Sequence, residues 1–89
     1  MRAVITVIGK DMVGILAKVS AVCARGNVNV TEVTQSILQD LFAMIMLVDL
    51  SAASVDFTAF SEKMGAIGAQ LGVDIRCTRQ ELYDAMHKV

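Results

Sequence analysis

The stretch GKDMVGI, residues 9–15, decides how this chain folds. A strand pattern ends at its first glycine, Gly9, and a helix pattern begins at its second, Gly14. A helix that starts here leaves the backbone N–H groups of its first turn without partners inside the helix. Such a turn is a place where an anion can bind. We therefore expect a ligand site at this point of the chain.

The residues before and after this stretch predict a β-α-β unit. Val, Ile and Thr over residues 2–8 predict a strand that is buried largely on both faces. Apolar residues then recur at three- and four-residue intervals as far as Gly26, which stands where a helix C-cap belongs. Residues 28–38 predict a second strand. Its apolar side changes near Thr31 and Glu32, which indicates a β-bulge.

A second unit of the same layout follows. Residues 41–50 predict a strand that is apolar on both faces, so something must cover each face. An apolar stripe of helical period predicts a helix over residues 57–71 that ends at Gly72. Gly65 and Gly68 lie inside it, and we expect close approach of the helix to the sheet or to a neighbouring chain to compensate for them. Residues 73–78 predict the fourth strand.

A last helix is predicted after the fourth strand. Thr78 and Glu81 have the spacing of a capping box. One face of this helix is then apolar, and its members are Leu82, Ala85, Met86 and Val89.

Two interleaved right-handed βαβ units predict a ferredoxin-like α+β sandwich: a four-stranded antiparallel sheet with two helices on one face, plus the C-terminal helix. We interpret residues 1–89 as a single domain with a core over 1–79 and a helical tail over 80–89. Hydrophobic residues form 55% of this short chain, more than one small core can hide. The surplus predicts a homodimer or a higher homo-oligomer, with the open face of the third strand covered by a second subunit.

Charge and composition argue against several classes of function. The net charge is −1 and no basic run occurs, so we expect no nucleic-acid partner. The longest apolar run, Leu41–Val48, is far too short to cross a bilayer, and neither a signal peptide nor a membrane anchor is evident. Cys23 and Cys77 form no metal-binding pattern, and both lie on the apolar side of their elements. Together these features predict a cytoplasmic protein.

Residues suited to catalysis are few. His87 is the only histidine and lies at the end of the chain, so no Ser/His/Asp or Cys/His arrangement has a well-placed base. Ile15 and Leu16 stand where a phosphate-binding loop needs Lys and Ser or Thr. The pair Met44 and Met46 is interpreted as packing. We predict no enzyme activity, no metal and no cofactor.

The stretch KDMVGIL, residues 10–16, and Asn29 within GNVNV, residues 26–30, resemble the ACT domain, a regulatory module that binds amino acids. The resemblance covers residues 1 to about 79. It is strongest to the small stand-alone ACT proteins of bacteria and archaea, which share the opening run over residues 3–11.

The resemblance implies a ligand at the connection between the first strand and the first helix, commonly at a subunit interface. Asp11 and Asn29 would contact its amino or polar groups, and backbone from Met12 to Ile15 would surround its carboxylate. The implied binding residues are Asp11, Met12, Val13, Gly14, Ile15, Asn29 and Val30. Gly9 departs from serine-binding members of the family, some of which have histidine there.

Two functions remain open from the sequence. The first is a regulatory module that binds an amino acid or similar small molecule as a homo-oligomer and acts on a regulated protein in trans. The second is a structural interaction module without a small ligand, whose open sheet face and C-terminal helix dock another protein.

Overall fold

The computed structural model describes residues 1–10 and 14–86. The elements follow in the order β1 (Arg2–Gly9), α1 (Ile15–Arg25), β2 (Asn29–Leu38), β3 (Leu41–Asp49), α2 (Phe57–Leu71), β4 (Asp74–Arg79) and α3 (Gln80–Met86). The predicted order of strands and helices is confirmed, and α2 has the bounds that its apolar stripe predicted.

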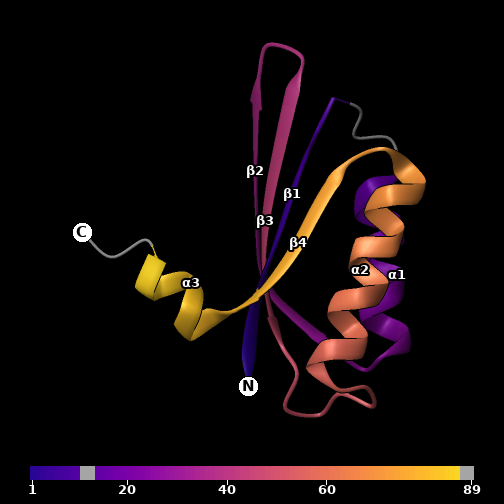
Figure 1. The fold of residues 1–89 in the computed structure, drawn as a ribbon, viewed down its shortest axis with the longest axis vertical. Helices are drawn as coiled ribbons and strands as arrows, with labels where there is room; N and C mark the ends of the chain where they lie inside the picture. Colours follow the sequence, from indigo (N-terminus) through magenta and orange to yellow (C-terminus); the bar gives the residue numbers. More distant parts are fainter. Residues whose placement is uncertain (11–13, 87–89) are drawn as a thin grey trace.

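The four strands form one antiparallel sheet in the order β2-β3-β1-β4. The two central strands are therefore β1 and β3, as in the predicted ferredoxin-like arrangement. α1 and α2 lie side by side on one face of the sheet, whereas α3 lies on the other face (Figure 1). The face that the sequence left open is thus partly occupied by the chain's own last helix.

The hydrophobic core lies between the sheet and the layer of α1 and α2. Met44 and Met46 of β3 are fully buried there together with Phe60 and Met64 of α2. The packing role predicted for the two methionines is confirmed. The opposite face of β3 keeps an apolar side chain, Ile45, in contact with solvent.

The predicted bulge lies in β2. The pairing of β2 with β3 shifts register between Val30 and Glu32, which leaves Thr31 as the extra residue. The Thr31 hydroxyl donates a hydrogen bond to the carbonyl oxygen of Leu47 at 3.1 Å, so the bulge is tied to the neighbouring strand.

The predicted capping box before the last helix is wrong. Thr78 belongs to β4, where it pairs with Val4, and the strand continues to Arg79 opposite Ala3. Strand pairing therefore takes the residues that would have capped the helix, and α3 begins only at Gln80. The stripe predicted for this helix is not packed as a core, because Leu82 and Met86 are exposed. Val89 lies outside the described residues.

The hairpin of β2 and β3 extends beyond the end of the helix layer (Figure 1). None of the described helices lies beside its tip, where Gln39 adopts a left-handed conformation with φ 57°. Side chains on the outer edge strand are accordingly exposed from Thr31 to Ile37.

Candidate functional site

Gly9, at the end of β1, is required by close packing. A Cβ atom built on Gly9 would collide with the side chain of Val73, in the connection between α2 and β4. There is no room at this position for a larger side chain such as histidine. A ligand at this end of the sheet must therefore be held by other groups.

Gly14 supplies the turn into α1. It has φ 78°, a left-handed conformation that side chains disfavour; apart from its chain neighbours and its own helix backbone, none of the described residues has an atom within 4 Å of the place where its Cβ would be. Its carbonyl oxygen accepts a hydrogen bond from the Lys18 N–H at 3.0 Å, which closes the first turn of the helix. The glycine is needed here for its backbone conformation, and not for close packing against the described part of the chain.

The N-terminus of α1 offers hydrogen-bond donors. The N–H groups of Ile15, Leu16 and Ala17 have no partners within the helix. No side chain of the described residues caps this end. The N-terminus of α2 differs, because the Asp56 carboxylate accepts a hydrogen bond from the Ala59 N–H at 2.7 Å. Ile15 itself is buried in the core, so only its backbone can reach a ligand.

Three of the predicted binding residues, Asp11, Met12 and Val13, lie outside the described residues. The structure places the others in two groups. Gly14 and Ile15 lie at the end of the sheet where β1 stops, and Asn29 and Val30 lie where β2 starts.

These two groups are far apart within one chain. Asn29 pairs with Asp49, and Asp49 also pairs with Arg2 at the beginning of β1. Gly9, at the other end of β1, pairs with Phe42. The seven positions from Phe42 to Asp49 correspond to about 23 Å at a rise of about 3.3 Å per residue. One chain therefore does not bring Asn29 to the N-terminus of α1.

The side chain of Asn29 is exposed and makes no hydrogen bond within the described part of the chain. Val30 is half-buried, packs against the core and pairs with Val48 of β3, so its side chain is not available to a ligand. The start of β2 thus presents one amide side chain on an edge strand.

Asp49, opposite Asn29, is a carboxylate that the sequence patterns did not single out. Hydrogen bonds from the hydroxyl and backbone N–H of Ser51 hold the pKa of this carboxyl below its usual range. Its Oδ1 also lies 4.0 Å from the N-terminal ammonium group of Met1. An ionised acid therefore accompanies Asn29, and its position became apparent only when the register of β2 and β3 was known.

The other titratable groups give little support for catalysis or metal binding. Burial raises the pKa of the Cys23 thiol. Across residues 1–10 and 14–86, no three His, Cys, Asp or Glu side chains converge in a way that could hold a metal ion. His87 lies outside this part of the chain. In the same described ranges, none of the helices has the length and apolar character needed to span a membrane.

Comparison with known proteins places these observations in a family. A model of the ACT domain matches residues 2–78. The protein MK1213 of Methanopyrus kandleri, named as a UPF0237 protein, is 48% identical over 88 residues, which cover 99% of this chain and 98% of that protein.

Solved structures agree with the family match. An ACT domain protein from Streptococcus pneumoniae superimposes with a TM-score of 0.81 at 36% identity, over 98% of both chains. A formyltetrahydrofolate deformylase from Pseudomonas syringae matches with a TM-score of 0.77 at 28% identity, over 88% of this chain but 27% of the enzyme. By its sequence along nearly all of its length and by its fold, this chain belongs to the ACT-domain family.

Proposed function

We propose that this protein is a non-enzymatic, cytoplasmic ACT module that binds an amino acid or a similar small ligand as a homodimer and reports its occupancy to a regulated protein. One observation carries the proposal: the N-terminus of α1 presents N–H groups that have no partners within the helix, and no side chain of the described residues caps it. A ligand carboxylate is the natural partner of such a helix end.

This helix end is too weak a site to act alone. A carboxylate at a helix N-terminus gains about 0.3 to 1 kcal/mol, and up to about 2 kcal/mol when it is partly buried. Micromolar affinity needs about 8 kcal/mol. Further groups must therefore contact the ligand, and Asp11 in the connecting loop and Asn29 are the proposed ones.

Asn29 would come from a second protomer. If the β2 edges of two copies pair antiparallel, the start of one β2 lies beside the end of the other. The end of β2 is at the same end of the sheet as Gly9, because Ile37 pairs with Phe42 and Phe42 with Gly9. Such pairing would bring Asn29 and Val30 of one copy towards Gly14 and Ile15 of the other, which is how the two halves of the site would meet.

The β2 edge has the character of an interface. Val33 is 43% exposed and Ile37 is 65% exposed, although both are apolar and lie on a strand with an unpaired edge. Exposed apolar edge strands readily pair with another chain. The hairpin that carries them extends beyond the chain's own helices (Figure 1), so a second copy has access to it.

Ligand binding and dimerisation should therefore be linked. Isothermal titration of the purified protein with each of the twenty amino acids, together with sedimentation velocity, tests both. We expect heat from at least one amino acid and a stronger dimer in its presence. Asn29→Ala should abolish the heat, whereas Gln70→Ala, which removes an exposed amide on α2, should leave it unchanged. If no amino acid gave heat or changed the melting temperature, the proposal that the protein binds an amino acid would be refuted.

A second experiment tests whether two copies pair through the β2 edge. Ile37→Lys should convert the dimer to monomer and also abolish ligand binding, because it replaces an apolar side chain of the paired edge with a charged one that would lie against the start of the partner's β2. Leu82→Lys places the same charge on α3 and should leave the dimer intact. A dimer that survives Ile37→Lys but dissociates with Leu82→Lys would instead support the structural module that docks through α3, whose Leu82 and Met86 are exposed.

A further inference from the structure

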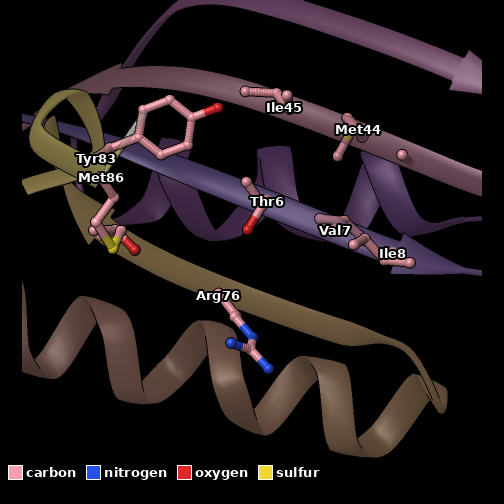
Figure 2. A pocket seen from close by; sticks show the side chains of 10 residues that line it. Thr6, Val7, Ile8, Met44, Ile45, Arg76, Tyr83 and Met86 are labelled. Carbon is pink, nitrogen blue, oxygen red and sulfur yellow. The ribbon is translucent and has the colours of Figure 1, made fainter. Parts of the chain in front are cut away.

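A groove of about 350 Å³ lies on the face of the sheet opposite α1 and α2, beside α3 (Figure 2). Thr6 of β1 lies in the middle of its floor, with Ile45 of β3 on one side and Arg76 of β4 on the other. These three residues are direct partners across adjacent strands, so they form one row over the sheet. Tyr83 and Met86 of α3 close one end.

The groove is largely apolar and largely uncovered. Ile8 is 47% exposed, Ile45 38% and Met86 60%. Exposure of large apolar side chains to water is unfavourable in free energy. Hydroxyl groups of Thr6 and Thr78 lie among them. A predominantly apolar hollow of this volume with a few polar groups is typical of small-molecule sites.

Arg76 sets the charge of the groove. Of the described residues that line it, Arg76 is the only one that is charged at neutral pH. Its Nε donates to Oδ2 of Asp74 at 3.2 Å, an exposed pair of small energetic weight. Within the described part of the chain, the guanidinium donates hydrogen bonds through Nε alone. Its terminal N–H groups, which have the geometry to bind a carboxylate, remain available.

We propose that this groove is a second binding site, for an amphipathic organic carboxylate whose apolar body lies over Ile45 and Met86 and whose carboxylate meets Arg76. Thr6 and Thr78 also line the groove, and a threonine hydroxyl can donate a hydrogen bond to a carboxylate. A cavity of about 150 Å³ holds benzene, so a groove of this volume has room for a ligand of roughly ten non-hydrogen atoms. This site does not depend on the proposed amino-acid site, which involves the α1 terminus and the β2 edge.

An apolar surface of a second protein would fit this groove less well. It would bury Thr6 and the free N–H groups of Arg76 without hydrogen-bond partners, which costs free energy for each group. A carboxylate satisfies them, and an aliphatic body covers the remaining apolar surface. The arrangement of polar groups on one side and apolar groups on the other therefore favours a small amphipathic anion.

Octanoate is a suitable probe, and octanamide is its uncharged counterpart of the same size. In a titration followed by two-dimensional amide NMR, octanoate should shift the resonances of Thr6, Ile45 and Thr78 and leave those of Gly14 and Asn29 unchanged. Arg76→Gln should weaken octanoate binding about tenfold. The same substitution should change octanamide binding by less than about twofold, because the amide carries no charge.

Two further variants complete the test. Arg25→Gln removes an exposed arginine from α1, in the opposite layer, and should leave octanoate binding unchanged. Ala43→Phe fills the groove with a side chain suited to a strand and should abolish binding of both probes. Absence of shifts in the groove, or equal affinity for octanoate and octanamide, would overturn the proposal. Groove resonances that change on dilution without any ligand would also overturn it and assign the surface to a second copy of the chain.

Discussion

Gly68 and Val73 hold α2 and the connection that leads to β4 together through their backbones. The Val73 N–H donates a hydrogen bond to the carbonyl oxygen of Gly68 at 2.9 Å. The carbonyl oxygen of Val73 would lie 2.8 Å from a Cβ atom on Gly68, and the side chain of Ile75 would lie 3.2 Å from it. Only a residue without a side chain permits this approach, so the glycine stabilises the contact between helix and strand.

Gly68→Ala should therefore destabilise the protein. The added methyl group meets a backbone atom that cannot move without shifting the whole connection, and overpacking of this kind costs about 1 to 3 kcal/mol. Urea denaturation followed by circular dichroism measures the change in the free energy of unfolding.

Gly65 provides the matched control on the same helix. Apart from its chain neighbours and the backbone of its own helix, none of the described residues has an atom within 4 Å of the place where its Cβ would be, and the residue is exposed. Gly65→Ala should raise the free energy of unfolding by about 0.5 to 1 kcal/mol, because alanine favours the helix and restricts the unfolded chain. Equal effects of the two substitutions would show that helix propensity, and not the contact with Val73, sets the stability here.

The two glycines also show what the sequence could and could not predict. Close approach was expected for both, but only Gly68 continues the buried stripe of Phe60 and Met64 at four-residue spacing. The periodicity that located α2 so well therefore contained this distinction too. The residue that approaches Gly68 could not be predicted from the sequence. The approach of Val73 depends on how the chain turns after Gly72, and local sequence patterns do not specify that path.

The candidate site was less predictable than the fold. Asn29 comes only fifteen residues after Gly14 in the sequence. The crossover through α1 nevertheless returns the chain to the opposite end of the sheet before β2 begins. Proximity in a sequence motif thus says little about proximity in space. The position of α3 was also not predictable, because Thr78 can cap a helix or pair in a strand, and only its partner Val4 decides between them.

Asp56 should matter for stability through its cap on α2. Its carboxylate satisfies the Ala59 N–H at 2.7 Å, one of the donors left unpaired at this helix end. Asp56→Ala should lower the free energy of unfolding by about 1 kcal/mol, measured by urea denaturation, whereas Asp56→Asn should retain most of it. Glu62→Ala, on the exposed side of the same helix, is the control and should have little effect. A loss with Asp56→Asn as large as that with alanine would point to the charge instead of the hydrogen bond.

Because of Cys77, the free energy of unfolding should fall as the pH rises in the alkaline range. Burial, and to a smaller extent the nearby Cys23, raises the pKa of the Cys77 thiol to about 11. In the unfolded chain this thiol titrates at about pH 8.5. Between these two values the native protein therefore binds more protons than the unfolded chain, so the free energy of unfolding falls as the pH rises. Below about pH 8.5 the thiol is protonated in both states and has no such effect.

Comparison with a variant isolates this contribution from the other groups that titrate in the same range. Cys77→Ala removes a partly buried side chain and should be less stable than the wild type at about pH 7.5, but the difference should narrow at about pH 10, because only the wild type loses stability by ionising this thiol. Urea denaturation at both pH values gives the two differences. Ile75→Val, on the same face of β4, has no ionisable group, so its difference from the wild type should stay constant. A constant difference for Cys77→Ala as well would mean that the thiol ionises as readily in the folded protein as in the unfolded chain.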